Sequence, residues 1–333
     1  MLQCAAGMRV LRNGVITWIR KAIADDMNSS GTTDPAQTAE IVKIAFQGEH
    51  GAYGEAAVIE HTAAGSGTAV TVPCETFDDV FATVSEGRCD FGFLPIENSL
   101  AGSIHRNYDL LLLNNVHVIG EHFTRVSHCL IGLPEARLEH VRKIISHPQA
   151  LAQCEQSIRK LPGGPAGNQT PVRAEPVYDT AGSVKLVKQY GDRTIAAIAS
   201  RRAAELYGMQ ILAEGFEDDP SNYTRFLIIA RDPHNSGSDS VENTAASGYK
   251  TSIVFALKNR PGALFRALSV FALRDIDLTK MESRPLAGKP WEYFFYIDLA
   301  GSTAEKNVQN ALANLDEFAS FLRVLGSYPR HTI

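Results

Sequence analysis

The residues best suited to chemistry lie at 221–226, where a loop enters the apolar run at 227–230. Thr224 offers a hydroxyl proton, and the planar guanidinium of Arg225 can bind a carboxylate through two parallel hydrogen bonds. Neighbouring residues of a regular strand point to opposite faces, so these groups share one cleft only if the backbone is irregular before the strand begins. The alternative is an ordinary strand start, with Arg225 solvated at an edge.

Length and charge narrow the class of protein. The chain has 333 residues, enough for two or three domains, and a formal net charge of −5. A negative net charge argues against a nucleic-acid partner. For the same reason, an anionic substrate needs a local cation such as Arg225. Because no apolar run is long enough to cross a bilayer, we expect no membrane partner either.

Cysteine and histidine usage indicates no metal chemistry. The five cysteines form no C-x-x-C pair, which favours a reducing compartment and free thiols over disulfides or a zinc site. The histidines are dispersed, and His122 and His128 fit no common ligand spacing. We therefore expect neither a metal nor a cofactor.

Residues 1–40 are interpreted as a leader and a linker. Residues 1–23 carry four basic residues, and no acidic residue precedes Asp25. An organelle transit peptide and a docked leader helix both fit this pattern. We expect a cytoplasmic protein, with an organelle (plastid) as the alternative.

Strands and helices alternate across residues 41–232, which predicts an α/β fold with mostly parallel strands. The chain is expected to leave lobe one near Glu121 and re-enter it near Glu214, with residues 210–213 leading back. Lobe one then comprises about 41–120 and 214–232, and lobe two about 121–213. The double crossover would leave a cleft between the lobes.

Residues 233–249 form a second polar linker, and residues 250–333 a separate domain. Its pattern is strand, helix, strand, strand, helix, strand, the order of a ferredoxin-like (βαββαβ) unit. Pro261 fits the first turn of the first of these helices.

Four polar clusters follow predicted strands, where open α/β sheets bind their ligands. They are Gln47-Gly48, Glu97-Asn98-Ser99, His147-Pro148-Gln149 and Asp179-Thr180. Each cluster alone is weak evidence, since Asn98 and Ser99 could be turn residues and Asp179 a plain N-cap. Their convergence with Thr224-Arg225 on one crevice between the lobes predicts a site for a small polar anion.

With these motifs, residues 44–328 resemble prephenate dehydratases, including the arogenate-using relatives. The matching segments are Phe46-Gln47-Gly48 with Gly51-Ala52-Tyr53, Pro95-Ile96-Glu97-Asn98-Ser99, His147-Pro148-Gln149, Asp179-Thr180-Ala181 and Thr224-Arg225-Phe226. The chain departs from the family at Gly54, where relatives usually have a serine. The resemblance implies a two-lobed, periplasmic-binding-protein-like catalytic domain followed by an ACT regulatory domain.

The resemblance also implies the reaction and its residues. Prephenate loses CO2 and water to give phenylpyruvate, and arogenate gives phenylalanine directly. Thr224 is expected to donate to the leaving oxygen and Arg225 to bind a carboxylate, while Glu97 tunes the site or anchors a neighbour. The expected substrate contacts are Gln47, Asn98, Ser99, His147, Gln149, Asp179, Thr180 and Phe226.

The ACT domain is expected to bind phenylalanine as an effector. The family uses two segments for this, here Gly262-Ala263-Leu264-Phe265 and Glu282-Ser283-Arg284-Pro285. ACT domains usually pair, so a homodimer or homotetramer is expected. Two alternatives stay open: a solute-binding protein without catalysis, and an amino-acid-responsive regulator whose catalytic half is inactive.

Overall fold

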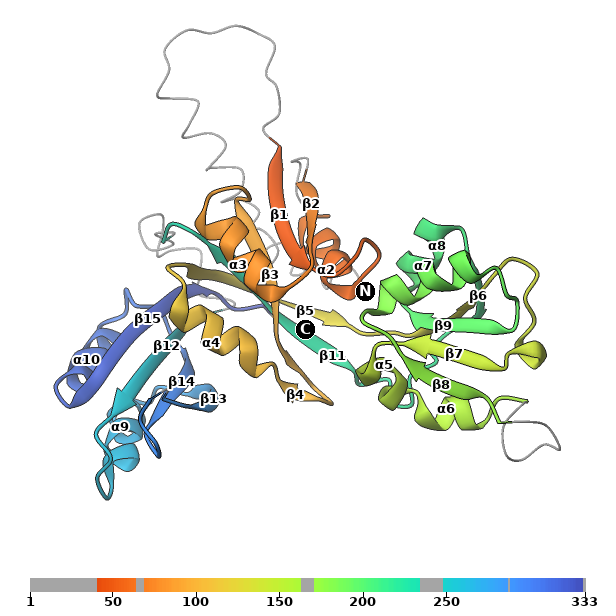
Figure 1. The fold of residues 1–333 in the computed structure, drawn as a ribbon. Coiled ribbons are helices and arrows are strands. Elements are labelled where there is room, and N and C mark those ends of the chain that lie inside the picture. The colour runs from red at the N-terminus through yellow and green to blue at the C-terminus, as the bar shows by residue number, and fades with distance from the viewer. Residues whose placement is uncertain (1–40, 64–68, 163–170, 234–247, 287, 332–333) are drawn as a thin grey trace, which may run out of the picture.

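The computed structural model describes residues 41–63, 69–162, 171–233, 248–286 and 288–331 (Figure 1). The predicted leader at 1–40 and most of the linker at 233–249 lie outside this part of the chain. Within it, no helix is long and apolar enough to span a membrane.

Lobe one is a mixed six-stranded sheet in the order β2-β1-β3-β11-β5, with β4 on β3. Its strands are β1 (Val42–Gln47), β2 (Ala69–Cys74), β3 (Phe91–Asn98), β4 (Gly102–Ser103), β5 (His117–Arg125) and β11 (Tyr223–Ala230). Its helices are α2 (Tyr53–Thr62), α3 (Phe77–Ser85) and α4 (His105–Leu113).

Lobe two is a five-stranded sheet in the order β10-β6-β9-β7-β8. Its strands are β6 (Cys129–Gly132), β7 (Lys143–Ser146), β8 (Arg173–Pro176), β9 (Ile195–Ala199) and β10 (Gln210–Ala213). Its helices are η2 (Leu138–His140), α5 (Pro148–Gln153), α6 (Glu155–Arg159), α7 (Thr180–Tyr190) and α8 (Arg201–Tyr207).

Most strands of each lobe run in the same direction, as predicted, but each sheet also contains a strand that runs against its neighbours. Strand β1 pairs in parallel with β2 and β3, and β7 with β8 and β9, but β11 runs antiparallel to both β3 and β5. In lobe two, β6 is antiparallel to both of its neighbours. Strands β6 and β11 are the first strands after the two crossovers between the lobes, and they run against the strands of the βαβ units.

The crossover lies later in the chain than expected. Strand β5 stays paired with β11 as far as Arg125, so the chain leaves lobe one at residues 126–128 rather than near Glu121. The outgoing and returning segments bond each other there, through Val126 N to Asn222 O at 2.8 Å. Strand β10 pairs with β6, so residues 210–213 belong to lobe two and do not return the chain to lobe one.

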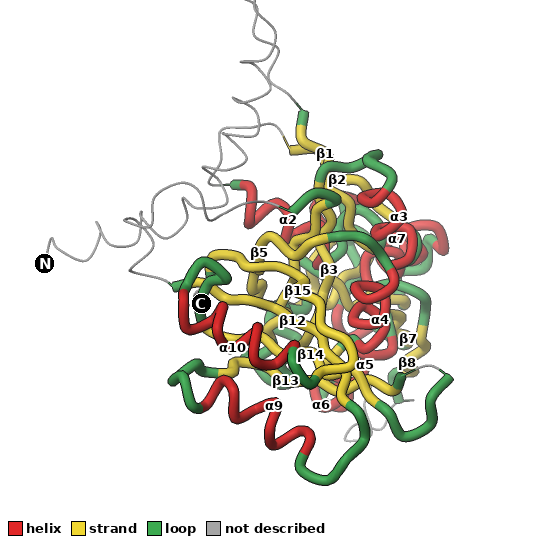
Figure 2. Tube along the Cα trace, turned by 90° about the vertical axis from the view of Figure 1, so that its left-hand side faces the viewer, coloured by secondary structure: helices red, strands yellow, loops and turns green. Residues whose placement is uncertain are grey.

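The C-terminal domain has the predicted ferredoxin-like order, and its antiparallel sheet runs β13-β14-β12-β15. Its elements are β12 (Tyr249–Leu257), α9 (Ala263–Ala272), β13 (Leu278–Pro285), β14 (Tyr293–Ala300), α10 (Lys306–Asp316) and β15 (Ala319–Pro329). Figure 2 views the molecule from the side of this domain, with α9 and α10 on the face of the sheet away from lobe one. The other face packs against lobe one, and Val254, Leu325 and Tyr328 share its core with Leu227 and Ile229.

The two lobes touch tightly at the turn before α2. Gly51 has a φ of +92°, and a Cβ there would lie 2.9 Å from the Cα of Ala203 in α8. Ser200 Oγ also donates to the Gly51 carbonyl at 2.6 Å. Only glycine combines this backbone conformation with so close an approach.

The buried Glu55 carboxylate bridges the same contact. It accepts hydrogen bonds from Arg202 Nε at 2.9 Å, Gly51 N at 2.8 Å and Thr71 Oγ1 at 2.9 Å. Burial alone would raise the pKa of Glu55, but these bonds and one from His50 lower it to about 2. The ionised form of this side chain therefore stabilises the fold.

We expect Gly51→Ala to lower the free energy of unfolding by about 3 kcal/mol, because a strained φ and a backbone clash add up. The matched control is Gly191→Ala, which has a φ of +66° and no atom within 4 Å of the new Cβ. It should cost only about 1 kcal/mol. Urea denaturation measures both, and equal losses would contradict the close contact.

Glu55→Gln should lower the free energy of unfolding by about 2–3 kcal/mol at pH 7. The folded pKa of Glu55 is depressed from 4.5 to about 2. Its stabilisation is therefore complete above pH 4.5 and is lost as the pH falls toward 2. Urea titrations from pH 7 to pH 3 should show the wild-type and variant curves converging, and a constant gap would argue against the assignment.

Candidate active site

Strands β3 and β11 place the predicted residues on two opposite faces. Thr224 is paired with Asn98 and Arg225 with Glu97. Cross-strand partners point to the same side of a sheet. One pair therefore faces lobe two, and the other faces the C-terminal domain.

A β-bulge at Ile96 produces this arrangement. Phe226 pairs with Pro95 although Arg225 pairs with Glu97, so Ile96 is an extra residue of β3. An extra residue reverses the in–out alternation of the strand. Leu94 and Ile96 lie in the core shared with the C-terminal domain. Without the bulge, Asn98 would face that domain as well.

A chain of hydrogen bonds, here called the interlobe network, connects Thr224 to lobe two. Asn98 Nδ2 donates to Thr224 Oγ1 at 3.0 Å, and Gln153 Nε2 donates to Asn98 Oδ1 at 3.4 Å. His128 Nε2 lies 2.9 Å from Gln153 Oε1, and Tyr53 OH lies 2.7 Å from His128 Nδ1. The network thus joins β3 and β11 to α5 and to the crossover segment.

The backbone fixes the direction of the first bond. Asn98 Oδ1 accepts from the N–H groups of Leu100 and Ala101, at 3.1 and 3.0 Å, so Nδ2 must be the atom that faces Thr224. The Thr224 oxygen accepts that bond and keeps its own proton free to donate. Thr224 is 8% exposed, so this proton lies in a largely dry environment.

His128 acts as a neutral link in the network. Burial lowers its pKa from the ordinary value of 6.5, so the ring is uncharged at pH 7. A neutral ring that donates from Nε2 to Gln153 must accept at Nδ1, where the Tyr53 hydroxyl lies. That hydroxyl is also 2.9 Å from the Ser127 carbonyl oxygen, so the two acceptors share its one proton. The network therefore carries no net charge.

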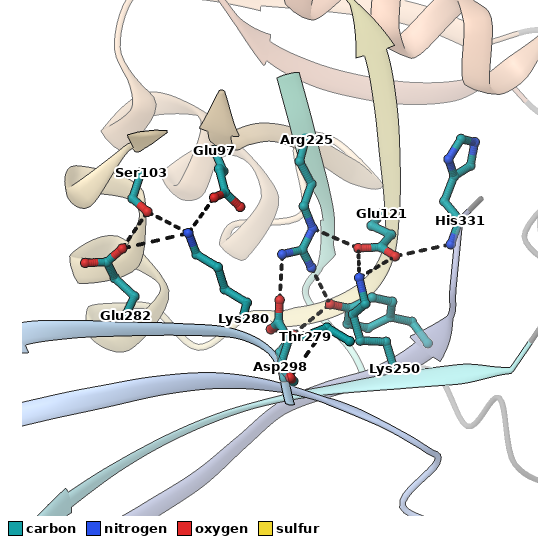
Figure 3. Close-up of polar contacts among 12 residues, drawn as sticks. Glu97, Ser103, Glu121, Arg225, Lys250, Thr279, Lys280, Glu282, Asp298 and His331 are labelled. Carbon is teal, nitrogen blue, oxygen red and sulfur yellow. Dashed lines mark hydrogen bonds and ion pairs between the residues drawn. The ribbon is translucent and has the colours of Figure 1, made fainter. Parts of the chain in front are cut away.

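Arg225 does not share a cleft with Thr224, and the prediction that it does is wrong. Residues 224 and 225 keep the regular register of β11, and the irregularity falls one residue later. The Arg225 side chain is 7% exposed and points at the C-terminal domain, as Figure 3 shows. It binds Glu121 at 2.8 Å, Asp298 at 2.6 Å and Tyr328 OH at 3.2 Å.

Glu97 shares this orientation. Its Oε1 accepts a hydrogen bond from Nζ of Lys280 in β13 at 2.7 Å (Figure 3). Of the two expected roles, tuning the site or anchoring a neighbour, the contact supports the second.

Gln47 and Asp179 line one pocket of about 530 Å³ between the lobes. Residues of lobe one and of the segment before α7 share its walls: Gln47, Gly48, Glu49, Pro73, Cys74, Glu75, Tyr178 and Asp179. Asp179 also caps α7 by accepting from Gly182 N at 2.9 Å, which is the simpler role considered for it. The two predicted residues are thus brought together from different lobes.

Three other predicted contacts serve local structure. Ser99 Oγ donates to Ser221 O at 2.8 Å and accepts from Tyr223 N at 2.9 Å, which ties the end of β3 to the start of β11. His147 caps α5, accepting from Gln149 N at 3.2 Å. Thr180 is the first residue of α7, and its carbonyl accepts from Ser183. Gln149 is exposed at the start of α5.

Phe226 was expected to contact the substrate, but it is a core residue in this structure. It is 2% exposed and its ring lies 6.5 Å from that of Phe93. The even-numbered face of β11 enters the core of lobe one immediately after Thr224.

The expected effector segments lie at the edge of the C-terminal domain. Gly262 precedes α9 with a φ of +75°, and the Phe265 side chain on that helix is 76% exposed. Ala263 and Leu264 pack against the domain core. On β13, Glu282 accepts from Ser103 and Arg284 binds Asp109, while Ser283 and Pro285 are exposed. The inner face of the second segment is thus bound to lobe one.

Four residues of the site were not among the predicted ones: Gln153, His128, Tyr53 and Asn222. Asn222 Oδ1 accepts from Asn98 Nδ2 at 2.8 Å. Gln153 is the last residue of α5, next to Cys154, which separates α5 from α6. For His128, the signal in the sequence is its position in the crossover between the lobes rather than its spacing from other histidines.

Cys74, Cys89, Cys129 and Cys154 are buried and free. Among the residues that the structure covers, no group of three or more His, Cys, Asp or Glu is arranged to hold a metal ion.

Comparison with known proteins agrees with this architecture. The prephenate dehydratase family model matches residues 44–234, and the ACT domain model matches residues 251–317. Arogenate dehydratase/prephenate dehydratase 2, chloroplastic, of Arabidopsis thaliana is 44% identical over 92% of this chain and 77% of its own.

Two solved structures share the fold with a TM-score of 0.74. One is prephenate dehydratase from Arthrobacter aurescens in complex with L-Phe, 30% identical over 87% of this chain and 90% of that one. The other is GqqA, described as a novel type of quorum quenching acylase, 35% identical over 87% and 98%. A match that covers both lobes and the C-terminal domain shows the family, and the chain belongs to the prephenate dehydratases that carry an ACT domain.

Proposed function

We propose that this protein catalyses the decarboxylating dehydration of prephenate to phenylpyruvate, with arogenate as the alternative substrate. The electron pair of the ring–carboxylate bond moves into the ring, CO2 leaves, and the ring hydroxyl departs as water after taking up one proton. Aromatisation of the ring supplies the driving force. The protein has to orient the substrate and assist the departing oxygen.

The Thr224 hydroxyl is the observation that carries the proposal. The Thr224 oxygen accepts a hydrogen bond from Asn98, so the Thr224 proton points away from Asn98 and can bond the departing oxygen. A threonine hydroxyl is a weak acid, and its contribution depends on positioning among preorganised polar groups. The interlobe network provides that positioning from both lobes.

The carboxylates of the substrate need partners other than Arg225, which faces the ACT domain. Gln47, Asn98, Gln149 and Thr180 remain candidates as neutral hydrogen-bond donors. The backbone N–H groups at the start of α7 add a partial positive charge. In this view the substrate is bound by many weak donors rather than by one ion pair.

The choice between prephenate and arogenate depends on whether a keto or an amino group is accepted on the side chain. The Arabidopsis relative carries both activities in its name, which supports testing both substrates. The decisive experiment measures turnover of each by one preparation. Absence of turnover with either would favour the inactive-regulator alternative.

The ACT domain is proposed to bind phenylalanine and to change catalysis from a distance. The phenylalanine complex of the Arthrobacter aurescens relative supports this assignment. We expect a homodimer or homotetramer, which analytical ultracentrifugation tests.

The chloroplastic location in the Arabidopsis relative's name supports the plastid alternative over the cytoplasmic one. Residues 1–40, which would contain the transit peptide, lie outside the described part of the chain. A fluorescent protein fused behind residues 1–40 and expressed in a plastid-bearing cell tests the location.

Thr224→Ala should lower kcat about 100-fold or more, because a positioned donor to the departing oxygen is lost. Thr224→Ser is the matched control and should retain most of the activity, since it keeps the hydroxyl. Phenylpyruvate formation from prephenate measures both variants. Near-wild-type turnover by Thr224→Ala would refute the assignment.

Phenylalanine binding should be coupled reciprocally to substrate binding. Calorimetry should therefore give different Kd values for phenylalanine with and without a substrate analogue. Identical values would contradict coupling between the ACT domain and the active site.

A further inference from the structure

Arg225 and Glu97 are held by the ACT sheet, although each is the immediate neighbour of a proposed active-site residue. Thr224 and Asn98 lie one position away on the same two strands and face lobe two. A movement of Arg225 and Glu97 must therefore also move their neighbours Thr224 and Asn98. The contacts of Arg225 and Glu97 show which residues hold them in place.

The surroundings of Arg225 form a closed and neutral group of charges. Its partner Glu121 has a fully buried side chain and also binds Nζ of Lys250 in β12, at 2.8 Å from both carboxylate oxygens. Its other partner, Asp298 of β14, accepts from Ser252 of β12 at 2.5 Å. Two cations and two carboxylates thus connect β11 and β5 with two ACT strands (Figure 3). Such a group tolerates little displacement, because an unpaired buried charge is costly.

Glu97 has a parallel connection to β13. Lys280 Nζ binds Glu97 at 2.7 Å and Ser103 Oγ at 2.8 Å, and Ser103 donates to Glu282 at 2.5 Å. Glu282 belongs to the segment expected to bind the effector. The strand that would sense phenylalanine is therefore bonded directly to the end of β3.

We propose that Arg225 and Glu97 are positioning residues through which the ACT sheet sets the placement of the Thr224 hydroxyl and the Asn98 amide. The proposal rests on the dehydratase function proposed above. A shift of the ACT sheet reaches the active site by this route, one residue along each strand. Misplacement of a catalytic group by about 1 Å can cost about 100-fold in rate, so small shifts are sufficient.

Two variants on the ACT side test the proposal without touching the active site. Asp298→Asn keeps the shape but removes a carboxylate bound to Arg225, and Lys280→Met removes the cation bound to Glu97. We expect each to lower kcat about tenfold while KM changes less than about twofold. The effect of phenylalanine on kcat should shrink at least about threefold. The Lys280 side chain is partly exposed, so Lys280→Met is less disruptive and tests the proposal if Asp298→Asn fails to fold.

Arg323→Met is the matched control. Arg323 of β15 docks the same sheet onto lobe one, but it donates to backbone carbonyls of Leu111, Leu112, Asn114 and Val116 rather than to β3 or β11. It should lower stability and leave kcat near the wild-type value. An equal loss of kcat in Arg323→Met, or wild-type kcat in both test variants, overturns the proposal.

Arg225→Lys separates the two roles considered for Arg225. A positioning role predicts a lower kcat at a similar KM, whereas a KM raised more than about tenfold at unchanged kcat would return Arg225 to the substrate carboxylate.

Amide hydrogen exchange is a readout that needs no turnover. Exchange at residues 223–226 should accelerate in Asp298→Asn and Lys280→Met but not in Arg323→Met. Unchanged exchange in all three overturns the positioning role. An inactive wild-type protein would instead overturn only the dehydratase function.

Discussion

The buried charges around Arg225 are the constraint on which this structure depends. Burial alone would lower the pKa of Arg225, but Asp298, Tyr328 and Glu121 raise it above its ordinary value, so the guanidinium stays charged. A charged guanidinium that is 7% exposed requires its carboxylates in place. One of these carboxylates comes from the catalytic domain and the other from the ACT domain. The two domains therefore meet in one geometry at this point.

The backbone reinforces that geometry beside the charges. Gly326 of β15 lies so close to β5 that a Cβ there would fall 1.8 Å from the Val118 carbonyl oxygen. No side chain fits between the strands, and the ACT sheet rests on the backbone of the strand that also supplies Glu121. Side-chain ion pairs and direct backbone contact thus act on the same two strands, β5 and β11. The sheet that carries Thr224 has a rigid support on its far side.

The sequence allowed the order of elements, the two lobes and the ferredoxin-like domain to be predicted, because apolar periodicity and polar linkers are local signals. The face of a strand to which each side chain points was harder to predict from the sequence than the order of the elements. A single inserted residue, Ile96, decides whether Asn98 faces lobe two. The local signal for this bulge is Pro95, since an inner strand accommodates proline mainly at a bulge. Adjacency of Thr224 and Arg225 suggested a shared cleft, whereas a regular strand separates them. The reversed direction of β6 and β11 was not predicted, because it depends on how the chain crosses between the lobes.

Magnitudes indicate why such a buried group suits regulation. Breaking one partner of a buried ion pair costs roughly 3–5 kcal/mol, whereas allosteric coupling is typically about 1–3 kcal/mol. A shift of the ACT sheet that weakens these ion pairs without breaking them therefore changes the free energy by enough to account for allosteric coupling. The two domains stay bound to each other during such a shift. The exposed pairs of the molecule could not do this, since each contributes less than about 1 kcal/mol. A positioning role for Arg225 explains its burial, whereas a substrate carboxylate would need a guanidinium open to the cleft.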